Sequence, residues 1–495
     1  MAGRARFKLF VTLVVGCIVL SLTPGGHAMG AQQVPVEGND RLFEVTMPSP
    51  AMQRDMKFRI LLPRGYADSN ERYPVLYLLH GVGDDETTWT RLTDVEGLTE
   101  PLDLIVVMPD SGKNENAGWY SDWFNGGAFG PPRYESHHIG ELIGYVEANY
   151  RALADRSQRL IAGHSMGGFG AMSYAARHPD LFVAAASFSG AVDTMIAEPS
   201  SWVAFQGLSF RGTPTTRVWG DQVQQEVIWR THNPTDLVTN LRGVKLSAVS
   251  GDGTPGPGDA PQGAAAPAAT EAGIRAMNGR FHAALEAANI PHNYREYSPG
   301  IHDWPYAQRN LQDALPMLMS ALGTPAPTEF TYRTAEKLFS LYGWNFEVNR
   351  QVMEFMEIAV TSGPVLTLKG SGKVQVTTPS LFEPGSEVSV SIGPKRSGEP
   401  EKRTADSEGR IQFEFVLGPS NTQQEFTAAS DAEKLSRGAS YFRIAEVRFA
   451  QLQTTQSSGS PALAETGAGG LVTVIGVILL AVGARVLMLQ RWRRA

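Results

Sequence analysis

Residues 163–167 read Gly-His-Ser-Met-Gly, a spacing that can present a serine as a nucleophile. The apolar stretch 160–162 before them is typical of a buried strand, and a helix is expected over 168–177. A sharp turn from strand to helix projects the serine hydroxyl, and its glycines avoid clashes with both elements. The helix N-terminus also favours developing negative charge. The pattern therefore predicts that Ser165 attacks a carbonyl carbon.

A serine hydroxyl is a weak nucleophile at neutral pH, so it needs a neighbouring base. Among the ten histidines, His302 is the best candidate, because it follows the strand expected over 293–297 and a Ser-Pro-Gly turn. The acid that orients this histidine must lie between the two in the chain. Asp252, after the strand expected over 244–249, and Glu271, which opens the following helix, both satisfy that order, and spacing alone leaves the choice open.

A tetrahedral intermediate also needs two backbone N–H groups that face its oxyanion, each worth about 3–4 kcal/mol. One is expected from Met166, directly after the nucleophile, and the other from Val82, in the loop after the strand expected over 75–79. Trp89 and Trp304 lie on predicted loops near the same edge, where an aromatic face would suit a sugar ring or an acyl chain. Packing is the alternative role for each tryptophan.

Strands and helices alternate around these residues. Continuous apolar runs bounded by turn residues are typical of strands buried on both faces, and they occur at 75–79, 104–108, 160–162, 183–188 and 244–249. Apolar spacing predicts helices over 141–151, 168–177, 273–288 and 307–322. The alternation predicts a parallel, doubly wound α/β sheet, with an antiparallel pair at its edge over 42–47 and 56–62. Residues 251–270 lack periodicity and are expected to form a loop or lid.

A second region differs from the α/β part in its pattern. Pro325 and Pro327 mark the boundary between a catalytic domain over 32–324 and a β-rich domain over 325–452. Short alternating strands with Gly/Pro turns, typical of a small all-β sandwich, occur at 366–377, 387–392 and 411–417. The Ser/Thr/Gln-rich stretch 453–462 is typical of a stalk.

The two ends of the chain have the patterns of targeting segments. Basic residues at positions 4, 6 and 8 precede an apolar run and then small residues, so 1–31 is predicted to be a signal peptide cleaved after Ala28 or Ala31. Segment 463–495 begins with Leu-Ala-Glu-Thr-Gly, continues with an apolar transmembrane span and ends in an arginine-rich tail. Either a wall anchor or a membrane anchor would leave the secreted body on the extracellular face.

The order of pentapeptide, apolar span and basic tail resembles a sortase cell-wall sorting signal. That resemblance implies cleavage between Thr466 and Gly467 and attachment of Thr466 to peptidoglycan, with sortase as a partner. The alternative is a simple single-pass anchor.

The composition of the 495 residues excludes several function classes. The net charge of −7 offers no basic excess to phosphate backbones, so we expect no nucleic-acid partner. The one cysteine, Cys17, lies in the predicted signal peptide, which excludes a disulfide scaffold, a cysteine nucleophile and a Cys-ligated zinc site in the mature protein. No metal site is required and no nucleotide motif is present, so we expect no cofactor.

From about Arg41 to Leu322 the sequence resembles the esterase D and antigen 85 superfamily of α/β-hydrolases. The matching segments are LLHG, GHSMGG, GDGTP and GIHDW, at 78–81, 163–168, 251–255 and 300–304. In that family the acid is a glutamate at the start of the helix after the segment that corresponds to GDGTP. Segment 271–281 aligns with that helix without gaps, so the resemblance favours Glu271 over Asp252.

The resemblance also suggests a substrate-binding role for His80. Antigen 85 enzymes have an aspartate at this position that helps to hold the sugar acceptor, whereas ordinary esterases of the superfamily have histidine. The sequence therefore lacks the aspartate expected of an enzyme that transfers acyl groups to the sugar trehalose.

Together these features predict a secreted serine esterase or acyltransferase that acts on acyl esters through an acyl-enzyme. Water, or a hydroxyl of a sugar, glycerol or glycolipid, would be the acceptor. A serine peptidase is the alternative enzyme, since the same triad cleaves amides. A surface adhesin that keeps a hydrolase scaffold is the non-catalytic alternative.

Overall fold

The computed structural model describes residues 30–113, 115–195, 214–259, 263–363, 365–393 and 400–452. The signal segment before residue 30, the stalk and the sorting signal with Thr466 and Gly467 lie outside the described residues. No helix in the described ranges is long and apolar enough to cross a membrane. The described residues up to Leu452 form one compact unit.

A nine-stranded sheet in the order β1-β2-β3-β5-β4-β6-β7-β8-β9 forms the first part of this unit. Its strands are β1 (Gln32–Pro35), β2 (Leu42–Ser49), β3 (Arg54–Leu61), β4 (Val75–Leu79), β5 (Ile105–Pro109), β6 (Arg159–His164), β7 (Ala184–Phe188), β8 (Lys245–Gly251) and β9 (Asn293–Tyr297). The first three strands pair antiparallel at one edge, and the others pair in parallel. Strands β4 to β7 are buried along their whole length, which confirms the predicted α/β-hydrolase sheet.

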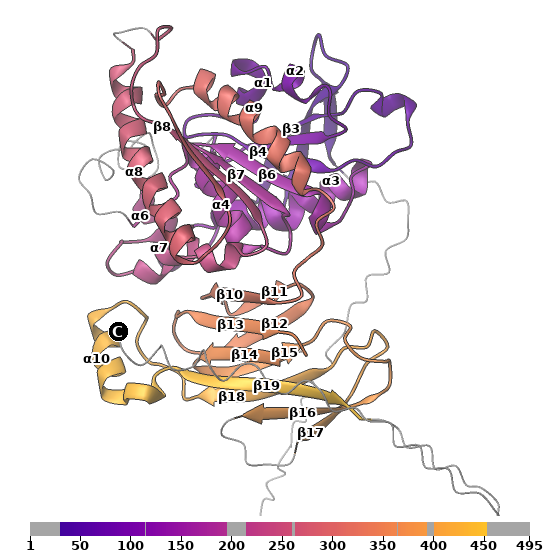
Figure 1. The fold of residues 1–495 in the computed structure, drawn as a ribbon, viewed down its shortest axis with the longest axis vertical. Helices are drawn as coiled ribbons and strands as arrows, with labels where there is room; N and C mark the ends of the chain where they lie inside the picture. The colour runs from indigo at the N-terminus through magenta and orange to yellow at the C-terminus, as the bar shows by residue number, and fades with distance from the viewer. Residues whose placement is uncertain are drawn as a thin grey trace, which may run out of the picture. The chain divides into compact units, whose positions relative to one another are not determined.

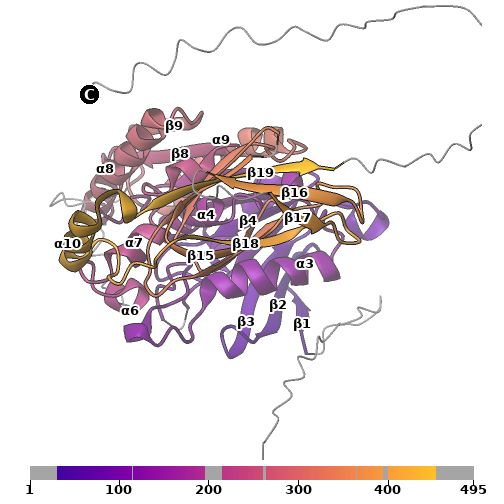
Figure 2. The same cartoon turned by 90° about the horizontal axis from the view of Figure 1, so that it is seen from below.

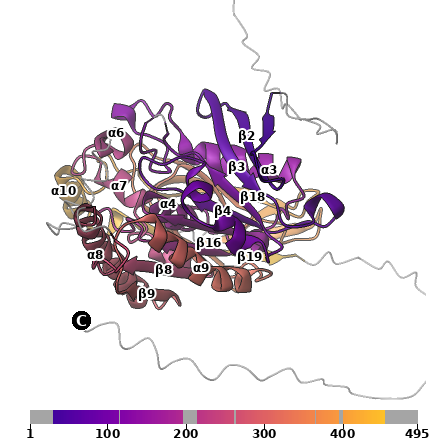
Figure 3. The same cartoon turned by 90° about the horizontal axis from the view of Figure 1, so that it is seen from above.

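Helices cover both faces of this sheet. One face packs against α3 (Ile143–Asn149), α4 (Met166–Arg177) and α8 (Ala265–Ala287). The other face packs against α1 (Thr88–Leu92), α2 (Val95–Thr99) and α9 (Trp304–Ala321). Figure 1 shows α9 crossing the sheet at β6 and β7, and Figure 3 shows α8 and α9 beside β8. Two shorter helices, α6 (Thr215–Trp219) and α7 (Glu226–His232), precede β8.

Helix α8 begins eight residues before the predicted start at residue 273, within the segment predicted to be a loop or lid. Alanine is the strongest helix former, and residues 264–269 are alanine apart from one proline. That residue, Pro267, lies in the first turn, where a missing N–H costs nothing. Glu271 therefore lies in the second turn of α8 rather than at its start.

The second part consists of two antiparallel sheets, in the orders β10-β13-β14-β19-β16-β17 and β11-β12-β15-β18. The strands are β10 (Phe330–Thr334), β11 (Leu338–Leu341), β12 (Trp344–Asn349), β13 (Met356–Thr361), β14 (Val365–Gly370), β15 (Gly372–Thr377), β16 (Glu387–Gly393), β17 (Glu401–Thr404), β18 (Gln412–Gly418) and β19 (Arg443–Gln451). Figure 2 shows β19 beside β16, with which it pairs. The sheets share one apolar core, as in a sandwich, and helix α10 (Ala428–Arg437) is an addition that the sequence pattern did not predict.

Hydrogen bonds join the two parts. Asn240 donates to the Arg333 carbonyl at 2.9 Å and accepts from the Arg333 N–H at 2.7 Å. The Tyr342 hydroxyl donates to the Pro179 carbonyl at 3.0 Å. Phe355, from the second part, is buried within the apolar core of the first. The β-rich part is therefore packed onto the α/β part within the same compact unit.

Candidate active site

Ser165 occupies a strained turn between β6 and α4. Its backbone has φ 59° and ψ −119°, a conformation that is rare outside glycine. A Cβ atom on Gly163 would lie 2.3 Å from the Gly167 carbonyl oxygen, and one on Gly167 would lie 2.4 Å from the Leu79 carbonyl oxygen. Both flanking glycines are therefore required by close backbone packing. The Ser165 N–H donates to the Phe188 carbonyl at 2.9 Å, which ties the turn to β7.

A chain of hydrogen bonds connects this serine to a histidine and a glutamate. The Ser165 Oγ lies 2.8 Å from His302 Nε2, and His302 Nδ1 lies 2.7 Å from Glu271 Oε2. Because Nδ1–H donates to the carboxylate, Nε2 is left to accept the serine proton. The structure thus brings together the three side chains that sequence analysis proposed as nucleophile, base and acid.

The Glu271 carboxylate is fully buried and both its oxygens are engaged. Its second oxygen, Oε1, accepts hydrogen bonds from the Ser189 hydroxyl at 2.7 Å and from the Gly251 N–H at 2.5 Å. The His302 N–H donates to the Pro267 carbonyl at 3.2 Å, which connects the histidine loop to the first turn of α8. Sequence analysis did not identify Ser189, although its place directly after β7 put it at the same edge of the sheet.

Asp252, the other candidate acid, is used elsewhere. Its carboxylate accepts the Thr254 N–H at 2.8 Å and closes a local turn after β8. Within the described part of the chain it makes no hydrogen bond to His302. The structure therefore places Glu271, and not Asp252, against the histidine.

The two predicted oxyanion donors flank the nucleophile. Met166 is the first residue of α4, so its N–H has no acceptor within the helix. Val82 lies beside Ser165 in the lining of one cavity, and across the described residues its N–H donates to no backbone acceptor. The Met166 Sδ accepts a hydrogen bond from the Trp119 N–H at 3.3 Å. This contact anchors the Met166 side chain.

His80 does not face substrate, contrary to the prediction. It is 1% exposed, its Nδ1–H donates to the Gly81 carbonyl at 2.8 Å, and its Nε2 accepts from the Ser111 N–H at 2.8 Å. Burial lowers the pKa of this imidazole, which keeps it neutral in that tautomer. His80 therefore holds the loop that carries Val82, because neither of its ring nitrogens is left for a ligand.

The two predicted tryptophans have different places. Trp89 is 1% exposed and donates from Nε1 to the Leu79 carbonyl at 3.0 Å, so it is a packing residue and the prediction that it contacts substrate is wrong. Trp304 is half-buried and lines the cavity at Ser165. The two indoles meet edge to face with centroids 4.9 Å apart, so Trp89 supports Trp304 from behind.

The cavity at Ser165 has a volume of about 270 Å³ and contains side chains that sequence analysis did not select. His164 stacks on His302 with ring centroids 4.9 Å apart, and its burial lowers its pKa well below the usual range. A neutral ring is therefore packed beside the proposed base. Asp84 also lines the cavity, three residues after Gly81. An acidic residue directly after the loop of Val82 was the signal that could have identified it.

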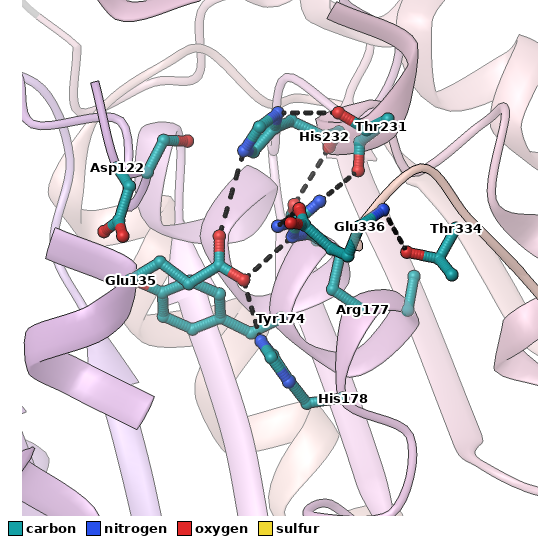
Figure 4. A network of polar contacts seen from close by, with 12 residues as sticks. Asp122, Glu135, Tyr174, Arg177, His178, Thr231, His232, Thr334 and Glu336 are labelled. Atoms are coloured by element: carbon teal, nitrogen blue, oxygen red, sulfur yellow. Dashed lines mark hydrogen bonds and ion pairs between the residues drawn. The ribbon is translucent and has the colours of Figure 1, made fainter. Parts of the chain in front are cut away.

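A second buried network lies at the far end of α4 (Figure 4). Glu135 Oε1 lies 2.8 Å from Arg177 Nε and 2.7 Å from His178 Nε2, and Oε2 lies 3.8 Å from His232 Nε2. Arg177 Nη2 also forms an ion pair at 2.9 Å with Glu336, just after β10. This network therefore links the nucleophile helix to the β-rich part.

Comparison with known proteins gives the family. Residues 49–318 match the Esterase family model, whose description is "Putative esterase". The chain belongs to this family. The resemblance proposed for residues 41–322 is thereby confirmed.

Two curated relatives illustrate how far the similarity extends. This esterase-family protein is 31% identical to the protein named Esterase Rv1288 of Mycobacterium tuberculosis, over 58% of this chain and 61% of that one. It therefore spans about three fifths of that relative's length. It is also 31% identical to the diacylglycerol acyltransferase/mycolyltransferase Ag85A of Mycobacterium gordonae, over 64% of this chain and 94% of the relative. Among solved structures, MPT51 of M. tuberculosis is 21% identical over 56% of this chain and 97% of its own, with a TM-score of 0.46.

Proposed function

We propose that this esterase-family protein is a serine ester hydrolase or acyltransferase that works through an acyl-enzyme. The observation that carries the proposal is the hydrogen-bonded chain from Glu271 through His302 to Ser165, which ends at a cavity. The carboxylate end of this chain is fully buried, and the hydroxyl end faces the cavity. An accessible hydroxyl with a positioned base is the arrangement that nucleophilic catalysis requires.

In the first half-reaction the Ser165 Oγ attacks the ester carbonyl carbon while His302 Nε2 takes the hydroxyl proton. The carbonyl oxygen becomes an oxyanion, held by the N–H groups of Val82 and Met166. Glu271 stabilises the imidazolium that forms and keeps Nδ1–H directed at its own carboxylate. His302 then gives its Nε2 proton to the leaving alcohol as the C–O bond breaks, and the acyl group stays on Ser165.

The acceptor decides whether the second half-reaction is hydrolysis or transfer. Water would release a free acid, whereas a hydroxyl of a sugar, glycerol or glycolipid would give a new ester. In either case His302 removes the acceptor's proton as it attacks, and then returns that proton to the Ser165 Oγ as the bond between the acyl group and Oγ breaks. The name of the relative from M. gordonae, a diacylglycerol acyltransferase and mycolyltransferase, supports transfer as one of the two outcomes.

The test is turnover of p-nitrophenyl butyrate by the purified chain and by its Ser165→Ala variant. We expect the wild type to release p-nitrophenol and the variant to fall by about 10³-fold or more, because the covalent step is lost. Product analysis with added glycerol or sugar separates a free acid from a transferred ester. Inert wild type would favour the adhesin alternative, and amide cleavage faster than ester cleavage would favour the peptidase.

We also propose that the protein is secreted and anchored to the cell wall, on the basis of the sequence patterns at 1–31 and 463–495. Sortase and peptidoglycan would then be its partners. Thr466→Ala should leave the protein in the membrane or the medium, as fractionation would reveal. Unchanged attachment to the wall would contradict the sorting signal.

A further inference from the structure

The cavity at Ser165 has an acidic wall that the proposed catalytic steps do not use. Asp84 lines it from the loop that carries Val82, and Trp304 and Asp303 line it from the start of α9. No lysine or arginine belongs to the described lining of this cavity. The cavity therefore combines an aromatic ring with carboxylates and lacks a cationic side chain that would neutralise them.

Asp84 lies close to the reacting atoms. A methyl group placed on Gly81 would be 3.0 Å from Asp84 Oδ2 and 3.4 Å from the Cβ of Ser165. The Asp84 carboxylate and Ser165 thus both border the position that a Gly81 side chain would occupy. At such a distance, in a partly desolvated cavity, one charge on a substrate would interact strongly with Asp84.

The Asp84 carboxylate has no ionic partner of its own. Among the described residues no cation lies within 4 Å of it, whereas the neighbouring Asp85 and Glu86 lie 2.9 Å and 3.7 Å from Lys113 Nζ. Burial raises the pKa of Asp84, and a backbone hydrogen bond from Gly81 and the charge of Arg91 offset this only in part. A partly buried carboxylate without an ion-pair partner is costly in a folded protein, so a cationic ligand would relieve it.

The alcohol part of an ester must occupy this cavity. His302 Nε2 delivers a proton to the leaving oxygen, so that oxygen and its substituent lie against His302, which lines the same cavity as Asp84 and Trp304. A substituent that extends from the leaving oxygen on this side therefore contacts the Asp84 carboxylate and the exposed face of the Trp304 indole. Carboxylate and indole together are the groups that recognise quaternary ammonium ions.

Resting on the proposed ester chemistry, we propose that Asp84 and Trp304 form a cation subsite on the alcohol side of the cavity. The preferred substrates are esters whose alcohol is an amino alcohol or carries a quaternary ammonium group. Alcohols that carry a carboxylate or phosphate are excluded by repulsion from Asp84 and Asp303. Asp84 is therefore the residue that sets selectivity by charge.

The test uses two esters of equal shape and different charge. Butyrylcholine carries a quaternary ammonium, and 3,3-dimethylbutyl butyrate replaces its nitrogen with carbon. We expect the wild-type kcat/KM to favour the cationic ester by about tenfold at about 0.01 M salt and about pH 8. Asp84→Asn should bring that ratio close to one. Asp55→Asn, which removes an exposed charge that does not line the cavity, should leave the ratio unchanged.

The ratio separates this subsite from a structural role for Asp84. If Asp84 only holds the Val82 loop, Asp84→Asn will slow both esters equally and leave the ratio unchanged, which overturns the inference. A wild-type ratio near one, or a ratio that does not fall when salt is raised to about 0.5 M, overturns it without any variant. If the wild type cleaves neither ester nor p-nitrophenyl butyrate, the proposed function itself fails, and the subsite falls with it.

Discussion

Helix α4 has a buried glutamate–histidine network at each end, and the two networks differ in the groups that pair with the carboxylate. At the N-terminus, Glu271 holds His302, whose other nitrogen binds the Ser165 hydroxyl in a cavity. At the C-terminus, Glu135 is bound by Arg177 and His178 and lies near His232. The first network ends in the Ser165 hydroxyl at its cavity. The second network also lines a cavity, of about 520 Å³, but its carboxylate is paired with the cation Arg177.

The comparison teaches that a buried carboxylate with a histidine is not by itself a catalytic signature. Around Glu135, positive charge from Arg177 balances the carboxylate, so the network stabilises packing between α4 and the β-rich part. Around Glu271, hydrogen bonds from neutral donors hold the carboxylate, and a charged imidazole is needed only during reaction. Four experiments test this contrast between the two networks.

Glu271→Gln should give the largest effect. The amide cannot stabilise the imidazolium and can impose the wrong histidine tautomer, so we expect kcat for p-nitrophenyl butyrate to fall by about 10³–10⁴. The thermal midpoint should change far less than the rate. Asp252→Asn is the matched control and should keep kcat within about threefold, because Asp252 bonds to Thr254 and Ser298 and not to His302. The reverse pattern would make Asp252 the acid.

Arg177→Met should mainly reduce stability. Removing the permanent cation leaves the buried Glu135 carboxylate with only His178 and His232 beside it, which costs about 3 kcal/mol of unfolding free energy. Urea unfolding followed by fluorescence measures this loss, and kcat of the remaining folded protein should change by less than about threefold. The double variant Arg177→Met with Glu135→Leu should recover part of the stability. A collapse of kcat at unchanged stability would show that the Glu135 network takes part in catalysis.

Acid should weaken the Glu135 network. Burial raises the pKa of Glu135, but Arg177 and His178 outweigh it, so the folded pKa lies below the ordinary 4.5. Its contribution is complete above about pH 4.5 and is lost as the pH falls. Burial also lowers the pKa of His232 to about 4, so the unfolded chain binds more protons between about pH 6.5 and 4, and stability falls there too.

Thermal melts from about pH 7 to about pH 3 would measure both effects. Glu135→Gln should flatten the part of the curve below about pH 4.5. If that variant keeps the slope of the wild type, the acid sensitivity has its origin in other groups.

Glu336→Gln should give the smallest effect. The Glu336 side chain is 40% exposed, so its ion pair with Arg177 is largely screened and worth less than about 1 kcal/mol. The amide can still accept the Arg177 hydrogen bond at 2.9 Å. A loss as large as that of Arg177→Met would show that the link between α4 and the β-rich part, and not the Glu135 pair, carries the stability of this junction.

Much of the α/β fold could be predicted from local patterns. Continuous apolar runs identified β4 to β7, because strands buried on both faces allow few polar residues. The start of α8 was missed because apolar periodicity does not register a run of alanines, which form helix by propensity alone. Helix α10 was missed for a related reason: only one of its residues, Ser430, is buried, so it lacks a core-facing apolar stripe.

The turn at Ser165 follows from local sequence, since a strand, a glycine-flanked serine and a helix are adjacent in the chain and steric contacts at Gly163 and Gly167 restrict the backbone. The acid that reaches His302 depends on tertiary packing, because Glu271 and that histidine are 31 positions apart in the chain. Tertiary packing likewise decided that His80 and Trp89 support the site and that Asp84 faces it. Residue type and spacing do not specify burial or hydrogen-bond partners, which depend on how distant elements pack together.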